Sequence, residues 1–314
     1  MQLSDRIGRR MKLHDLHVLM AVVQAGSMSR AAKLLNTTQP AVSRSIADLE
    51  HTIGVRLLDR RRHGVEPTAF GRAMLEGGTA MFDGLRQAVK NIEFLADPTA
   101  GEVRIGTTSR LAASFVSAVI DRMSRRYPRI VFKVVVGTSE AQQKNLSERS
   151  VDLLVSRRTR YFANDQVNFE ALYESPYVVA AGERNPWVRR RRINLAELMG
   201  ELWVLPSPDD SFGPFVAEAF RASGLEFPRT TVIASALEMC ANLLKTNRYL
   251  TILPEFWLQL PDRHPFIRKL AVTLPVTGEP IGIISLKNRT PSPVVRRFID
   301  CAREVAKPLA KQKS

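Results

Sequence analysis

The chain is 314 residues long and 45% hydrophobic, which is enough for two or three domains that each bury a core. Its only cysteines, Cys240 and Cys301, lie far apart in the sequence, so we expect neither a disulfide framework nor a thiolate metal site. Neither a signal peptide nor a run of about 18 apolar residues is present, so we expect a cytoplasmic protein without a membrane span. The formal net charge of +15 favours a polyanionic partner, but residues 1–97 hold only 14 of the 46 basic residues against 10 of the 31 acidic ones, so net charge does not locate the binding site.

Three short helices are predicted near the N-terminus, after an extension that spans residues 1–11. The first covers residues 13–25, where apolar side chains recur at steps of three and four. Ser29 is the predicted N-cap of the second helix and Thr38 that of the third, which tolerates Pro40 in its first turn. Two helices this close together, the second with an apolar inner face and a small polar outer face, are typical of a helix-turn-helix.

The outer face of the third predicted helix carries side chains that can read DNA. Gln39, Ser43 and Arg44 offer donors and acceptors for base edges and phosphates in a major groove. Three arginines then precede a turn at His63-Gly64, which is typical of a two-stranded wing that binds phosphates, although such a run taken alone can also be a solvated loop. The candidate DNA-binding residues are Ser29, Arg30, Thr38, Gln39, Pro40, Ser43, Arg44, Arg60, Arg61 and Arg62.

Residues 12–72 resemble the winged helix-turn-helix of LysR-type transcriptional regulators. The resemblance rests on Ala31-Ala32, Gln39-Pro40, Ser43-Arg44, Leu49-Glu50, Gly54 to Leu57 and Thr68 to Gly71. Leu58 and Asp59 depart from the family pattern, which predicts a change in wing packing only. The family implies a regulator that binds pseudo-palindromic promoter DNA as a homodimer or homotetramer and has RNA polymerase as a further partner.

Residues 68–97 are predicted to form one long linker helix after a DNA-binding domain of residues 1–67. Apolar or small residues recur along it at alternating steps of three and four, at Met74, Gly78, Met81, Leu85, Ala88, Ile92 and Leu95. Such a stripe can pack a helix on its own domain, but a helix this long between two domains favours dimerisation, which the resemblance also implies. Gly77-Gly78 weakens the helix and allows a bend.

Residues 98–314 are predicted to form a two-lobed α/β domain like that of periplasmic binding proteins. Strand and helix patterns alternate, which implies parallel sheets covered on both faces. By the resemblance, the chain crosses between the lobes near residues 163 and 265. Lobe one would then comprise residues 98–162 and 265–314, and lobe two residues 163–264.

Polar groups at strand ends point to a ligand site between the lobes. A helix cap is the alternative reading for Thr138, and a turn residue is the alternative for Ser207. The family resemblance implies a small-molecule effector, anionic or sugar-like, held by Thr107, Ser109, Arg110, Thr138, Arg157, Ser207 and Phe212. A family turn rich in glycine is replaced here by residues 245–249, where Asn247 can adopt a left-handed conformation and Arg248 can point over the cleft.

Other functions are disfavoured. No hydrolase, phosphate-loop or dinucleotide motif is present and the five histidines are scattered, so we expect no enzyme, cofactor or metal site. A solute receptor would need a signal peptide, whereas an architectural DNA-binding dimer without a ligand remains open. The run Arg189 to Arg192 favours a solvated loop over a second nucleic-acid contact, and Cys240 favours a core filler over a redox sensor.

Overall fold

The protein divides into two compact units, residues 1–89 and 90–314. The structure is a computed structural model that describes residues 11–61, 64–158, 162, 165–174, 176–208, 212–229, 232–234, 236–258, 265–275 and 280–310. Nearly all of the predicted extension, together with Arg62 and His63 of the predicted wing, therefore lies outside the described residues.

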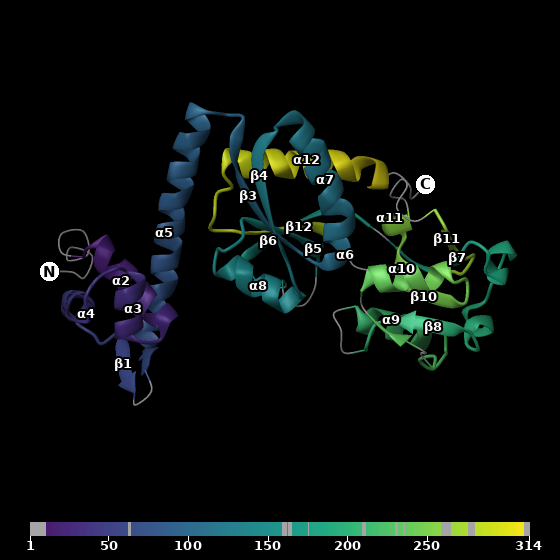
Figure 1. Cartoon of the computed structure of the whole chain (residues 1–314), viewed down its shortest axis with the longest axis horizontal. Coiled ribbons are helices and arrows are strands. Elements are labelled where there is room, and N and C mark those ends of the chain that lie inside the picture. Colours follow the sequence, from purple (N-terminus) through teal and green to yellow (C-terminus); the bar gives the residue numbers. More distant parts are fainter. Residues whose placement is uncertain are drawn as a thin grey trace. The chain divides into compact units, whose positions relative to one another are not determined.

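The first unit packs three helices and a two-stranded wing around one core (Figure 1). Leu16, Leu19, Ile46 and Leu49 lie at its centre, each at most 3% exposed. The wing strands are antiparallel with Arg61 opposite Gly64, which confirms the predicted hairpin. The elements are α2 (Leu13–Ala25), α3 (Met28–Leu34), α4 (Gln39–Ile53), β1 (Leu58–Arg61) and β2 (Gly64–Pro67).

Serine and threonine side chains cap the two helices of the helix-turn-helix. Thr38 caps α4 as predicted, because its Oγ1 accepts a hydrogen bond of 3.4 Å from the backbone amide of Ala41. The cap of α3, however, is Ser27, whose Oγ accepts from the amide of Arg30 at 3.1 Å. The prediction of Ser29 was wrong because buried Met28 already belongs to the helix, which places Ser29 in its first turn.

Helix α5 (Ala69–Ala96) runs without interruption through Gly77 and Gly78. Its first half belongs to the core of the first unit, where Met74 packs and where a Cβ at Gly78 would lie only 3.0 Å from Leu16. Further along, one stripe of large apolar side chains is 40% to 80% exposed. This stripe comprises Met81, Leu85, Val89, Ile92 and Leu95. The first half of the predicted seam therefore packs on its own domain, and the second half is exposed in the single chain.

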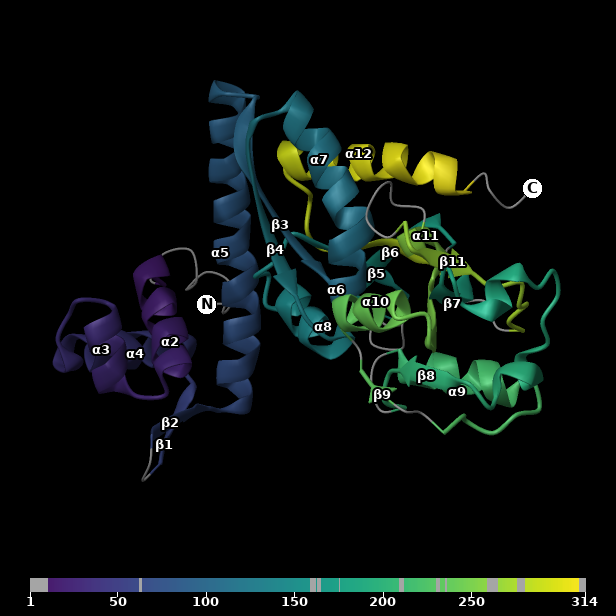
Figure 2. The same cartoon turned by 45° about the vertical axis from the view of Figure 1, so that its right-hand side comes forward.

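Lobe one of the second unit is a mixed sheet in the order β4-β3-β5-β12-β6, covered by helices on both faces (Figure 2). Leu153 and Val155 share a core with the helices α7 and α12, while Leu154 between them packs toward α8 on the other face. The elements are β3 (Ala100–Thr107), α6 (Ser109–Leu111), the π-helix η1 (Ala112–Val116), α7 (Ser117–Arg126), β4 (Arg129–Val136), α8 (Ser139–Ser147), β5 (Leu153–Arg157), β6 (Val167–Tyr173), β12 (Ile281–Leu286) and α12 (Pro293–Ala310).

Lobe two has the strand order β11-β7-β10-β8-β9. Trp203 and Leu205 pack with the helix α9 on one face, and Val178 and Ala180 pack with α10 on the other. The elements are β7 (Tyr177–Gly182), the 3-10 helices η3 (Pro186–Arg189) and η4 (Leu195–Leu198), β8 (Leu202–Leu205), α9 (Gly213–Arg221), β9 (Val232–Ile233), α10 (Leu237–Lys245), β10 (Tyr249–Pro254), α11 (Glu255–Leu258) and β11 (Ile267–Lys269).

The predicted two-lobed α/β fold is confirmed, with two differences in detail. Neither sheet is purely parallel, because β12 is antiparallel to both of its neighbours and β7 is antiparallel to β10 and β11. The crossings between lobes come later than residues 163 and 265. Strand β6 still pairs with β12 in lobe one, and β11 still pairs with β7 in lobe two, so the chain crosses after Tyr173 and returns after Lys269.

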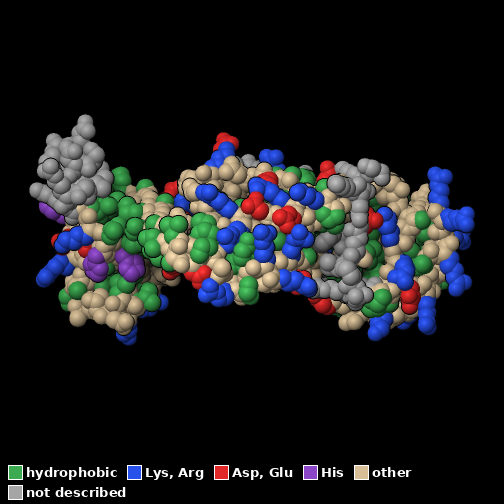
Figure 3. Space-filling view, turned by 90° about the horizontal axis from the view of Figure 1, so that it is seen from above, with side chains coloured by type: hydrophobic (Ala, Val, Ile, Leu, Met, Phe, Trp, Pro, Cys, Tyr) green, Lys and Arg blue, Asp and Glu red, His purple; other side chains and the backbone are tan. Residues whose placement is uncertain are grey.

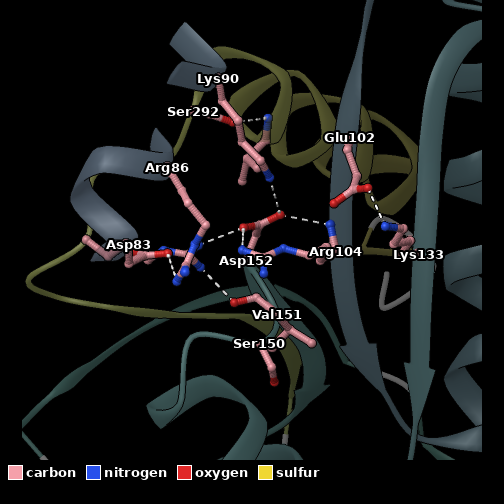
Figure 4. Close-up of polar contacts among 12 residues, drawn as sticks. Asp83, Arg86, Lys90, Glu102, Arg104, Lys133, Ser150, Val151, Asp152 and Ser292 are labelled. Carbon is pink, nitrogen blue, oxygen red and sulfur yellow. Dashed lines mark hydrogen bonds and ion pairs between the residues drawn. The ribbon is translucent and has the colours of Figure 1, made fainter. Parts of the chain in front are cut away.

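A buried carboxylate ties the end of α5 to lobe one (Figure 4). The side chain of Asp152, just before β5, is 2% exposed and lies 2.8 Å from Arg104 of β3 and 3.6 Å from Lys90 of α5. Arg289, just after β12, donates to the same carboxylate at 2.7 Å. Three segments distant in the sequence therefore meet at one acidic side chain.

Candidate nucleic-acid interface and effector site

The outer face of α4 presents polar side chains on a rigid support. Val42, Ile46 and Leu49 bury its inner face, while Gln39 and Arg44 on the outer face are exposed. A helix fixed in this way can enter a major groove with its polar side free to meet base edges.

The other predicted DNA contacts are placed as follows. Ser29, Arg30, Thr38 and Pro40 are exposed and Ser43 is half-buried. The side chains of Arg60 and Arg61, and the whole of Arg62, lie outside the part of the chain that the structure describes. The described candidates therefore lie on α3, at the N-cap of α4 and along α4, and the two helices share one core.

The wing is fixed to α4 by a carboxylate. Glu50 Oε1 accepts hydrogen bonds from the backbone amides of Leu57 at 2.7 Å and Leu58 at 3.1 Å, so the Leu-Glu pair noted in the sequence closes the corner between helix and wing. At the wing's far end, Thr68 Oγ1 donates to the carbonyl of Arg56 at 2.8 Å and accepts from the amide of Gly71 at 3.0 Å. A side chain at Gly71 would collide with the wing, since its Cβ would lie 2.0 Å from the carbonyl oxygen of Leu57.

The two lobes meet through stacked arginines. Arg110, just after β3, has its guanidinium carbon 4.2 Å from the ring centroid of Phe212 in lobe two. Arg157, at the end of β5, lies 4.5 Å from the ring centroid of Tyr177. Strands β3 and β5 are adjacent and parallel, so both arginines leave the same edge of the sheet.

The rings under these arginines form one aromatic surface. Tyr177 lies 4.4 Å from Phe212 and 4.1 Å from Phe215 between ring centroids, and Phe212 stacks on Phe215 at 5.5 Å. We call Arg110, Arg157, Tyr177, Phe212 and Phe215 the inter-lobe cluster. Cationic and aromatic groups arranged in this way can hold a planar or anionic small molecule.

The remaining predicted ligand residues have different surroundings. Thr107 is buried and its hydroxyl donates to the carbonyl of Val155 at 2.8 Å inside the sheet. Thr138 caps α8, with its Oγ1 accepting from the amide of Ala141 at 3.3 Å, and it lines a separate cavity of about 500 Å³ beside Phe162 and Leu286. Ser109 is exposed and Ser207 is half-buried.

Tyr177 and Phe215 were not predicted as site residues. Each stands at the start of an apolar pattern, on β7 and α9, where sequence reasoning assigns an aromatic ring to the core. A positional signal exists only for Tyr177, which follows closely after the point where the chain enters lobe two, whereas Phe215 joins the cluster through its ring contact with Tyr177. The π-helix η1 directly after α6 is a second local sign of a functional site.

Two groups near this cluster stay protonated at neutral pH. Burial raises the pKa of the Tyr173 phenol, outweighing the nearby charge of Arg157. Burial also raises the pKa of the Cys240 thiol, outweighing the charge of Arg110. A protonated buried thiol is a poor nucleophile, in line with the expected core filler.

The described residues hold neither a cluster of metal ligands nor a membrane-spanning helix. Among them, no group of three or more His, Cys, Asp or Glu side chains is placed to hold a metal ion. No helix in the same residues is both long and apolar enough to cross a membrane.

Comparison with protein families gives matches over most of the chain. Residues 13–72 match the family model described as "Bacterial regulatory helix-turn-helix protein, lysR family", and residues 96–307 match that of the "LysR substrate binding domain". The chain is 26% identical over 301 residues to the HTH-type transcriptional regulator GbpR of Azospirillum brasilense, covering 94% of this chain and 86% of that protein. It is also 26% identical over 299 residues to the Hca operon transcriptional activator HcaR of Escherichia coli (strain K12), covering 94% and 98%.

Solved structures share the fold. Full-length CbnR in complex with its target DNA superposes with a TM-score of 0.55 at 23% identity, covering 94% of this chain and 100% of CbnR. A full-length OxyR variant from Pseudomonas aeruginosa superposes with a TM-score of 0.65 at 18% identity, covering 96% and 100%.

Proposed function

Because the chain belongs to the LysR family of transcriptional regulators, with a DNA-binding helix-turn-helix and an effector-binding domain, we propose that α4 reads a pseudo-palindromic promoter site under the control of a small molecule. The observation that carries this proposal is the exposed outer face of α4, with Gln39 and Arg44 above a buried apolar stripe. The wing arginines contact the flanking phosphates, and RNA polymerase is the further partner.

Pairing of two chains through α5 supplies the two-fold symmetry that such a site requires. Five large apolar side chains are exposed along the second half of the helix at steps of three and four residues. A stripe of this kind is costly in water and is covered when a second copy of the helix packs against it. This argument supports a dimer as the basic unit, and two dimers would pair into a tetramer through their C-terminal domains.

The proposed effector binds at the inter-lobe cluster. Arg110 and Arg157 supply positive charge, and Phe212 supplies an apolar surface, so an anionic or planar small molecule suits the site. Ser109 and Ser207 are proposed as supporting hydrogen-bond partners. A ligand that replaces the stacking contacts would shift the balance between lobe arrangements and so the response at the promoter.

The test is selection of duplexes from random-sequence DNA by the full-length protein, followed by binding measurements on the selected site. Arg44→Ala is expected to weaken binding to that site about 5-fold to 150-fold, the loss associated with one good base contact. Lys33→Ala, which removes an exposed cation from α3, serves as the control. Equal affinities for Arg44→Ala and the unaltered protein would contradict the assignment of α4.

A further inference from the structure

One end of lobe two carries a dense group of exposed arginines. Figure 3 shows Lys and Arg side chains gathered at its right-hand edge, over lobe two. We give the name arginine ledge to six exposed arginines of lobe two that lie in the segment around η3 and in the turn hydrogen-bonded to it. It consists of Arg184, Arg189, Arg190, Arg191, Arg192 and Arg248, all of them exposed.

Hydrogen bonds hold the backbone that precedes the arginine run. Asn185 is 4% exposed and its Nδ2 donates to the carbonyl of Asn247 at 3.0 Å, while Asn247 Oδ1 accepts from the amide of Arg184 at 2.9 Å. Asn247 adopts the expected left-handed conformation, with φ of 62°. This turn joins the backbone next to Arg248 to that of Arg184 and Asn185.

The other end of the run is anchored too. Ile193 is 4% exposed and its amide donates to the carbonyl of Ala271 at 3.0 Å. Just before the run, Trp187 of η3 packs against the lobe-two core, and the guanidinium carbon of Arg190 lies 5.7 Å from the centroid of the Trp187 ring. The arginines are therefore presented by a fixed backbone, which reduces the entropy lost when a partner binds.

The ledge carries positive charge that no carboxylate of the described residues neutralises. Within the described residues, none of its six guanidinium groups pairs with a carboxylate. The two nearest acidic residues in sequence have other partners, since Glu183 pairs with Arg268 at 3.4 Å and Glu197 accepts from the amide of Asn194 at 2.7 Å. Residues 98–314 as a whole hold 32 Lys and Arg against 21 Asp and Glu, so most of the excess charge lies outside the helix-turn-helix.

We propose that the arginine ledge is a second, sequence-independent contact for the DNA phosphate backbone. Every one of its cations is an arginine, whose planar guanidinium binds phosphate oxygens in a bidentate manner and holds its charge at any cellular pH. The positive charges of such a cluster repel one another. A polyanion offsets this repulsion when it binds, and it releases its own counterions. The proposal rests on the DNA binding proposed above and extends it to lobe two.

The test compares full-length proteins that differ by the same net charge. The ledge variant replaces Arg189, Arg190, Arg191 and Arg192 by Gln, and the control replaces four exposed lobe-one arginines by Gln. The control positions are Arg122, Arg125, Arg126 and Arg129. Binding to the selected duplex and to a scrambled duplex of equal length is measured across a range of salt concentrations. A third protein with Lys at the four ledge positions keeps the charge.

For the ledge variant, the slope of log affinity against log salt is expected to fall in magnitude by about 2 to 4, at about 0.9 per lost phosphate contact. Both duplexes should bind at least about 10-fold more weakly, while the Lys protein keeps most of the slope and the control keeps nearly all of it. Unchanged melting temperatures show that the variants are folded.

Three outcomes overturn the inference or its premise. Equal losses of DNA affinity in the ledge variant and the control would assign the effect to net charge and would contradict the proposed phosphate contact at the ledge. Unchanged DNA binding with reduced transcription by purified polymerase would assign the surface to an acidic protein instead. If the unaltered protein binds neither duplex, the proposed function itself fails.

Discussion

Asp152 accepts two hydrogen bonds from Arg104, one from the backbone amide and one from the guanidinium, each 2.8 Å long. Burial by itself raises the pKa of Asp152, but the hydrogen bond from Arg104 and the charges of Lys90 and Arg104 outweigh it and leave this pKa below its usual value. The carboxylate is therefore ionised in the folded protein over the whole physiological range, and it stabilises the fold only while it stays ionised.

Asp152→Asn is expected to lower the free energy of unfolding by about 3 kcal/mol at neutral pH, because it leaves buried cations without their counter-charge. Since the folded pKa is depressed, this stabilisation is complete above the unfolded pKa of about 3.9 and is lost as the pH falls through the folded pKa. Urea unfolding at several pH values should show the difference from the unaltered protein shrinking in acid. Asp300→Asn at an exposed ion pair is the control, and a pH-independent difference would refute the assignment.

The same substitution at two glycines of α5 should have opposite effects. Gly71→Ala is expected to destabilise the first unit by about 1–3 kcal/mol, because the new methyl group meets the carbonyl oxygen of Leu57 at 2.0 Å. Gly77→Ala, where no atom lies within 4 Å of the added Cβ, should stabilise the helix by about 0.5–1 kcal/mol. Thermal unfolding of both variants measures the contrast; changes of the same sign would contradict the geometry.

Charged residues on the exposed stripe of α5 should separate the dimer. Leu85→Glu combined with Ile92→Glu is expected to weaken self-association by about 100-fold, because both carboxylates would be buried against the partner helix. Sedimentation velocity over a range of protein concentrations reports the change. Ile233→Glu places a charge on another exposed apolar residue, 66% exposed, and should leave the association intact. Dissociation by the control alone would move the interface to lobe two.

Substitution of two neighbouring arginines should distinguish an effect on ligand binding from an effect of surface charge. Arg157→Met should abolish the rise in melting temperature produced by an active compound from a panel of carboxylates and sugars, because Arg157 belongs to the inter-lobe cluster. Arg158→Met removes an exposed arginine that stacks 5.8 Å from Phe169 within lobe one, and should keep that rise. Loss of the response in both variants would point to charge rather than to the cluster.

Periodicity and capping predicted the regular elements well where local chemistry decides the structure. The wing hairpin, the Thr38 cap and the helices α4 and α5 all follow from apolar spacing and turn residues that act within a few positions. The crossing predicted near residue 163 came too early because of strand β6. An edge strand that pairs only with β12, more than a hundred residues later, leaves little local signal beyond a short alternation.

The inter-lobe cluster could be predicted only in part from the sequence. Arg110, Arg157 and Phe212 were expected from strand ends and family resemblance, but Tyr177 has a core-like sequence context and joins the site only through packing between the lobes. Thr107 looks like a ligand residue in the sequence, yet its hydroxyl is used by a neighbouring strand. Which hydroxyls remain available depends on tertiary pairing, which a single sequence does not specify.

The position of β12 has a consequence for synthesis on the ribosome. The core of the first unit is complete once residue 82 has emerged, and all strands of lobe two lie between residues 177 and 269. Lobe one begins earlier, but its sheet stays open between β5 and β6 until residues 281–286 arrive to pair with both. The lobe that starts first therefore finishes last. In a chain truncated before residue 281 the first unit could fold, but in lobe one β5 would lack one neighbour and β6 would have none.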